Sequence, residues 1–198
     1  MKHPHWQYFV ALCTDLEQAA RYVEVSTDNY STYSTEFSRL YLAAGSEVDV
    51  VAKLLCRQID PSVKLDGINS YRTTILKKYP NMPSVEVILP RYEISICPWQ
   101  DWRKGANPDW WRAYNDVKHE RDKHYKAANL ENTISAVAGL LVVVGYLYSN
   151  ELLKFQLLPQ PDFMRFDSKY TKVSATVMHR GYLLPDVPKP PDPPLPRR

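Results

Sequence analysis

Apolar residues recur with the helical period of about 3.6 along most of the chain. The pattern predicts helices over residues 6–23, 35–58, 68–79 and 129–149, and a further helix that begins near Asn107. Residues 35–58 carry the broadest apolar face, and Asp60-Pro61 ends that helix because proline clashes with helical continuation. The spacing therefore predicts a mainly α fold.

Between residues 84 and 97 the hydrophobic period changes to two. Val85, Val87 and Leu89 alternate with polar residues, then Ile94 and Ile96 do the same after Pro90-Arg91. Alternation interrupted by turn residues is typical of a small β-hairpin. A weaker alternation over residues 172–178 indicates a further strand.

These patterns predict one up-and-down helical bundle over residues 1–151, with four to five helices and the hairpin at 84–97 as an insertion. Residues 152–184 have no clear period and are expected to form a mixed, extended segment packed on the bundle. Residues 185–198 contain seven prolines, so we expect an extended Pro-rich tail that is disordered.

Residues 134–148 are almost uninterruptedly apolar, and Asn129 is expected to cap the helix that contains them. The run is about 15 residues long, whereas a membrane span needs roughly 20. Asn132 and Asn150 flank it, which favours a helix buried at the centre of the bundle over a membrane helix. We therefore expect no membrane association, and we expect Gly139 and Gly145 to permit close approach of neighbouring helices.

Composition excludes several classes of function. The formal net charge of +3 permits nucleic-acid binding through a local patch without requiring it. The three cysteines are far apart and form no CxxC pair, so neither a disulfide framework nor a zinc site is indicated, and we expect a reducing, cytoplasmic location. The six glycines form no phosphate-binding loop, so no cofactor is expected.

The most informative stretch is residues 107–126, which concentrates aromatic and basic residues. Asn107 is expected to cap this helix, Pro108 to occupy its first position, and Asp109 to complement its dipole. At about 100° per residue, a polar stripe faces one side and an aromatic stripe the other. The polar stripe consists of Arg112, Asn115, Asp116, His119, Lys123 and Lys126, and the aromatic stripe of Trp110, Tyr114, Val117 and Tyr125.

Two histidines in this stretch raise the question of a metal site. His119 and His124 are five residues apart, so they diverge by about 140° on a helix and cannot ligate one ion together. We expect no metal. His119 can instead exchange a proton near neutral pH, and Arg112 offers a permanent charge suited to phosphate oxygens. That pair is sufficient for metal-free RNA cleavage, in which the ribose 2′-hydroxyl attacks the adjacent phosphate. The alternative is an ordinary solvated helix face.

Arg121 falls within the aromatic stripe, where a buried arginine would need a partner. Three interpretations stay open. Arg121 pairs with a carboxylate such as Glu47 or Asp49, it faces a groove, or the helix ends or kinks before it.

The pattern Trp-Trp-x-x-Tyr-Asn-x-Val-Lys-His-x-Arg, followed by an apolar helix, resembles the bacterial branch of the HEPN superfamily. Members of that superfamily are small, mostly helical bundles, frequently dimeric, that occur in RNA-targeting toxins and defence systems. Their motif is an arginine, four to six residues, and a histidine, which Arg112 and His119 match at the longest spacing. Asn115 matches the asparagine that often precedes the histidine by four residues, but Tyr114 stands where the arginine usually is.

The resemblance implies a homodimer with a composite groove that both copies of His119 face. It assigns acid–base catalysis to His119, phosphate stabilisation to Arg112, orientation of the histidine to Asn115, and nucleic-acid contacts to Asn115, Lys118, Arg121 and Lys123. The first hypothesis is therefore a cytoplasmic RNA-binding protein of the toxin or defence type. It leaves two alternatives open: Arg112 takes the role of the missing arginine and the protein is a metal-independent endoribonuclease, or the protein is a HEPN-like bundle without cleavage activity. The second is a non-catalytic interaction or scaffold protein with an unknown protein partner, in which the motif residues are enclosed and bonded to carboxylates of the helix over residues 35–58.

Overall fold

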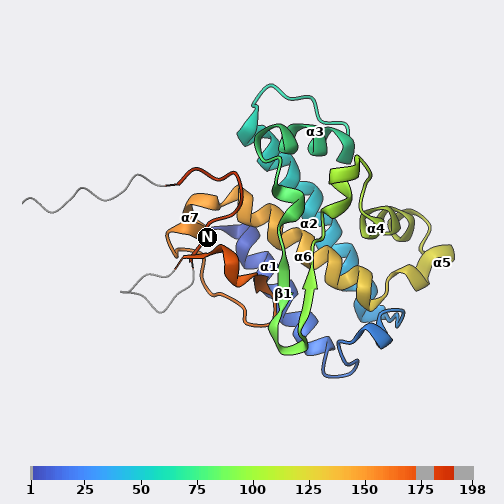
Figure 1. Ribbon diagram of the computed structural model, residues 1–198. Helices are drawn as coiled ribbons and strands as arrows, with labels where there is room; N and C mark the ends of the chain where they lie inside the picture. Colours follow the sequence, from blue (N-terminus) through green and yellow to red (C-terminus); the bar gives the residue numbers. More distant parts are fainter. Residues whose placement is uncertain (1, 173–180, 190–198) are drawn as a thin grey trace, which may run out of the picture.

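The computed structural model describes residues 2–172 and 181–189. It is mainly helical with a small antiparallel sheet, which confirms the predicted fold class (Figure 1). Its longer helices are α1 (Pro4–Ala19), α2 (Thr35–Ile59), α3 (Ile68–Lys78), α4 (Asp109–His119) and α6 (Leu130–Leu147). Two short helices, α5 (Arg121–His124) and α7 (Ser149–Leu153), follow α4 and α6.

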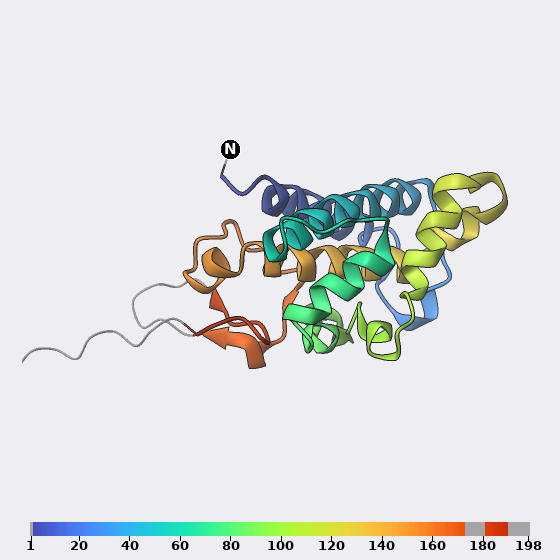
Figure 2. The same cartoon turned by 90° about the horizontal axis from the view of Figure 1, so that it is seen from above.

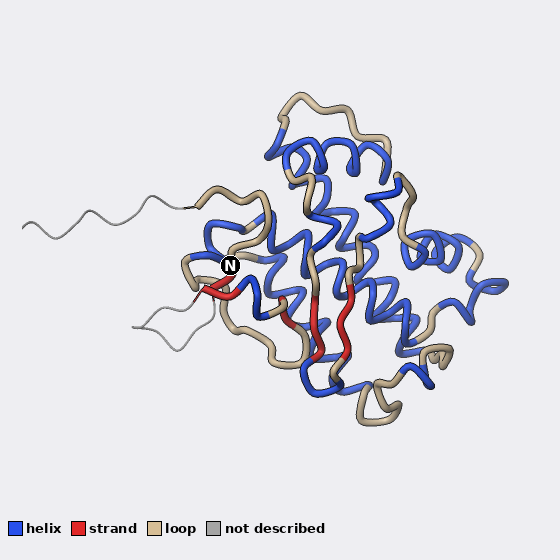
Figure 3. Tube along the Cα trace, in the orientation of Figure 1, coloured by secondary structure: helices blue, strands red, loops and turns tan. Residues whose placement is uncertain are grey.

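The predicted hairpin is present, and a third strand pairs with it. Strands β1 (Val87–Leu89) and β2 (Ile94–Ile96) are antiparallel, with Val87 opposite Ile96. Strand β3 (Arg165–Phe166) pairs with the other edge of β1, and Figure 3 shows these strands together. A second small sheet joins β4 (Thr171–Lys172) to β5 (Gly181–Tyr182). The strand predicted over residues 172–178 lies mostly outside the described residues.

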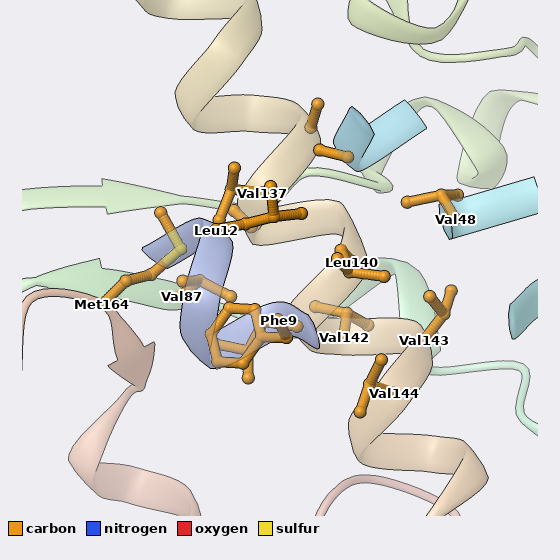
Figure 4. Close-up of a cluster of buried hydrophobic side chains, with 14 of the residues drawn as sticks. Phe9, Leu12, Val48, Val87, Val137, Leu140, Val142, Val143, Val144 and Met164 are labelled. Carbon is orange, nitrogen blue, oxygen red and sulfur yellow. The ribbon is translucent and has the colours of Figure 1, made fainter. Parts of the chain in front are cut away.

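Helix α6 forms the centre of the core. Its valines and leucines pack against α1, α2 and β1, as Figure 4 shows for Val137, Leu140 and Val142 beside Phe9 and Leu12. Within the described ranges, α6 is the one helix long and apolar enough to cross a membrane, and 78% of that window is buried inside the fold. Packing at the centre of the protein thus accounts for its apolar sequence.

Helices α2 and α6 lie side by side and run in the same direction (Figures 1 and 2). Their starts are joined by backbone hydrogen bonds from Leu130 to Thr32 (2.9 Å) and from Glu131 to Tyr30 (3.2 Å). This pair departs from the alternating directions of a simple up-and-down bundle. The long connection through α3, the sheet and α4 returns the chain to the end at which α2 began, so α6 can start there again.

Two helix caps were predicted, with different outcomes. Asn129 caps α6 as expected, because its side chain accepts a hydrogen bond from the Asn132 amide (2.9 Å). The cap predicted at Asn107 is wrong. Pro108 occupies the N-cap of α4, and the Asn107 side chain instead accepts from Arg72 and donates to Asn69, both at 3.2 Å.

The segment after α7 packs on the bundle. Leu157, Phe163, Met164 and Phe166 are buried. Contacts continue past residue 184 into the Pro-rich region, where Asp186 accepts from the Asn81 backbone amide (2.7 Å) and the Pro185 carbonyl accepts from Tyr146. The packed part therefore extends beyond the predicted start of the tail, whose residues 190–198 lie outside the described chain.

Candidate functional site

Helix α4 is held to the core by its aromatic face. Trp110, Trp111, Tyr114 and Val117 are buried, as the helical spacing predicts. Two glycines allow this close packing: a Cβ at Gly139 of α6 would lie 2.7 Å from the Trp110 ring, and a Cβ at Gly45 of α2 would overlap the Tyr114 ring.

Close approach of a helix at Gly139 was predicted, and the neighbour there is Trp110 of α4. At Gly145 the neighbour is Phe166 of β3, and not a helix. The predicted close approach of a helix is therefore confirmed at Gly139 and wrong at Gly145, where a strand takes that place.

The predicted polar stripe is present on α4 as far as His119, but it does not continue to Lys126 because α4 ends at His119. Glu120 leaves the helical region at φ −137° and ψ 52°, and α5 begins at Arg121 in a new direction. Among the three interpretations of Arg121, the helix therefore ends before it. Helices α4 and α5 lie at one edge of the molecule (Figure 1), and residues 118–121 at the turn between them are exposed.

A depression of about 670 Å³ lies at this turn. His119 and Arg121 are both exposed and both line it. The full lining is Leu42, Val117, Lys118, His119, Arg121, Asp122 and Tyr125. Arg121 therefore also faces a groove, which was the second of the three interpretations.

A second depression, of about 640 Å³, adjoins the first. Leu42, Arg121 and Tyr125 line both, so we treat the two as one surface feature, the α2–α5 groove. Its second half is completed by Thr35, Ser38 and Arg39 from the first turns of α2. Tyr125 closes the end of this half, with its hydroxyl 3.0 Å from the Thr35 hydroxyl.

The charged side chains that line the groove are mostly basic, and some of them have no acidic partner among the described residues. In the described part of the chain, no hydrogen bond or ion pair engages the His119 ring or the Arg121 guanidinium. The Lys118 ammonium lies 5.6 Å from the centre of the Tyr114 ring, whose phenol stays neutral because burial raises its pKa. Asp122 is the carboxylate of the lining. The groove thus presents a free imidazole and a free guanidinium to solvent.

The other predicted site residues do not line this groove. Arg112 is exposed near the start of α4 and forms an ion pair with Asp109. The Asn115 amide donates to the Trp111 carbonyl (2.8 Å), where it does not orient His119. Lys123 pairs with Glu120 at 2.7 Å. The structure therefore brings together Lys118, His119 and Arg121.

The carboxylates considered as partners for Arg121 are engaged elsewhere. Glu47 lies 2.6 Å from the His5 ring, and Asp49 pairs with Lys53 and accepts from the Tyr71 hydroxyl. The predicted pairing of Arg121 with either carboxylate is therefore wrong.

The α2 side of the groove is not evident from the sequence. Thr35, Ser38 and Leu42 lie about 80 residues before α5 in the sequence and meet it through the fold. One signal was available, because Ser38 is a polar residue on the apolar face of α2, between Phe37 and Leu40. Ser38 is only 3% exposed, and its hydroxyl has no hydrogen-bond partner among the described residues. An unpaired buried hydroxyl costs about 1–3 kcal/mol.

Within residues 2–172 and 181–189, no group of three His, Cys, Asp or Glu side chains is arranged to hold a metal ion. No family model, curated protein or solved structure matches this chain. The groove itself must therefore carry any functional conclusion.

Proposed function

We propose that this chain is a HEPN-like RNA-binding protein that cleaves single-stranded RNA without a metal ion, at His119. The observation that carries the proposal is the exposure of His119 and Arg121 on one open groove, each without a protein partner in the described part of the chain. A scaffold role would instead require these side chains to be enclosed and bonded to carboxylates of α2. A cytoplasmic location fits an RNA substrate.

His119 would exchange the proton that the reaction moves. Its imidazole accepts the proton of a ribose 2′-hydroxyl, and the 2′-oxygen forms a bond to the adjacent phosphorus. The bond from phosphorus to the 5′-oxygen then breaks, and the leaving oxygen takes a proton from the imidazolium. The products are a 2′,3′-cyclic phosphate and a 5′-hydroxyl, and the histidine returns to its starting state.

Arg121 is the better candidate for stabilising the phosphate. A guanidinium offers paired N–H donors in a plane that matches phosphate oxygens. Arg121 lines the depression that His119 lines, whereas Arg112 sits about two turns away and is already paired with Asp109. We therefore assign to Arg121 the role that the family motif would give to Arg112.

Lys118 extends the positive surface beside His119. Its ammonium has no carboxylate partner among the described residues and remains available to a neighbouring phosphate. Neutralising phosphates releases counterions, so RNA affinity should fall steeply with salt concentration.

We also propose that the protein is a homodimer formed through the exposed side of α4. Arg112 and Asp116 are exposed on this helix, which lies at the edge of the molecule (Figure 1). In such a dimer, two copies of the groove would face one RNA strand. The pairing of Arg112 with Asp109 fits a contact surface better than a catalytic centre.

The proposal is tested with matched substrates in the presence of EDTA. We expect the purified protein to cut a single-stranded RNA into fragments that end in a 2′,3′-cyclic phosphate. It should bind a DNA strand of the same sequence but leave it intact, because the attacking 2′-hydroxyl is absent. Gel analysis and mass spectrometry of the fragments provide the readout. RNA that is bound but remains whole contradicts the catalytic role, and RNA that is not bound contradicts the proposed function entirely.

A further inference from the structure

We propose that the half of the α2–α5 groove next to α2 is a pocket for one unpaired nucleobase. The inference rests on the proposed function, because it names the part of an RNA strand that this half would recognise. Such a pocket requires a single-stranded substrate with an accessible base, and not a duplex.

Ser38 is the observation that points to a ligand. Its side chain lines this half of the groove, is almost fully buried, and carries a hydroxyl without a protein partner in the described chain. A hydroxyl can both donate and accept, so it suits the edge of a base, where donors and acceptors alternate. Unpaired bases in single strands expose these edges for such hydrogen bonds.

The walls of the same half match the face of a base. Leu42 supplies an apolar surface and Tyr125 an aromatic ring. The ring is held in place at two points, because its hydroxyl contacts Thr35 and its edge packs against Tyr33 with the ring centres 5.7 Å apart. A fixed aromatic ring beside a cavity is a platform on which a base can stack. The volume of about 640 Å³ admits a base with its ribose.

Charge argues against a phosphate in this half. Arg39 lines it, but its guanidinium is bound to Asp15 (2.6 Å) and Glu36 (2.5 Å). Arg121 is the other cation of this lining, and it lies where this half meets the depression that His119 lines. A strand would thus place a phosphate at His119 and Arg121 and its neighbouring base against Ser38 and Tyr125.

The experiment compares two short strands that cannot be cleaved. One is a deoxypentanucleotide, and the other is the same sugar–phosphate chain without bases. Fluorescence anisotropy at one salt concentration measures both affinities. We expect the abasic chain to bind about 5- to 150-fold more weakly, the range that stacking of one base produces. Equal affinities overturn the base pocket while leaving RNA binding intact, whereas binding of neither strand overturns the proposed function as well.

Ser38→Ala tests the pocket itself. It should weaken binding of the base-containing strand about 2- to 10-fold and leave the abasic strand unchanged, because only the hydrogen bond to the base is lost. The thermal midpoint should stay the same or rise, since the variant removes an unpaired buried hydroxyl. Ser31→Ala, at an exposed serine outside the groove, is the matched control and should change neither affinity. A Ser38→Ala protein that binds both strands like the unmodified chain contradicts the assignment.

Discussion

Replacing His119 by alanine is expected to lower the rate of RNA cleavage by about 10²- to 10⁴-fold, the usual contribution of a positioned acid–base group. The side chain is exposed, lines the groove and has no hydrogen bond to the protein in the described part of the chain. Its removal should therefore leave the fold intact, and the thermal midpoint should change little. Single-turnover cleavage with excess protein measures the chemical step without interference from substrate affinity.

His124→Ala is the matched control for that experiment. His124 lies five residues further on, next to Glu120 at 3.7 Å, and does not line the groove. The control should cleave RNA at the rate of the unmodified protein. If His119→Ala retains that rate, or if both variants lose it equally, His119 is not the acid–base group.

Trp110→Ala is expected to lower the free energy of unfolding by about 3–5 kcal/mol. The side chain is 4% exposed, donates a hydrogen bond to the Pro98 carbonyl (2.8 Å), and meets Trp99 edge-on. Its ring also fills the space that Gly139 leaves open on α6. The substitution thus removes a close contact between α4 and the central helix and leaves a cavity in its place.

Chemical denaturation and calorimetry measure this effect. For a chain of this size, the loss corresponds to a thermal midpoint lowered by roughly 6–20 °C. Tyr22→Ala is the control, because that ring is 88% exposed and its loss should change stability by less than about 0.5 kcal/mol. A Trp110→Ala protein as stable as the control would mean that α4 is not anchored through this ring.

The sequence was sufficient to predict the helices whose apolar faces are continuous. Helix α2 begins at the predicted residue because its apolar positions recur at helical spacing from Phe37 onward, and it ends near the predicted residue because Pro61 prevents extension. The start of α6 was predictable from Asn129, which caps it through its own side chain. The hairpin followed from a change of period that no helix can accommodate.

The end of α4 was not predictable, because no proline or glycine lies between Trp110 and Asn129. Periodicity therefore extended the helix through residues that the fold places in a new turn. The extended helix placed Arg121 on the aromatic stripe, whereas the fold places it beside His119 at the groove. The α2 side of the groove was equally inaccessible, because Thr35 and Tyr125 are 90 positions apart and meet only through tertiary packing.

The central claim is that Arg121, and not Arg112, acts with His119 on a bound RNA strand. The most direct test measures single-stranded RNA affinity for Arg121→Gln and Arg112→Gln, with EDTA present and salt concentration varied. We predict that Arg121→Gln binds about 10- to 100-fold more weakly, with a salt dependence reduced by about one phosphate contact, while Arg112→Gln stays within twofold of the unmodified protein. Equal losses in the two variants, or a loss confined to Arg112→Gln, would contradict the account.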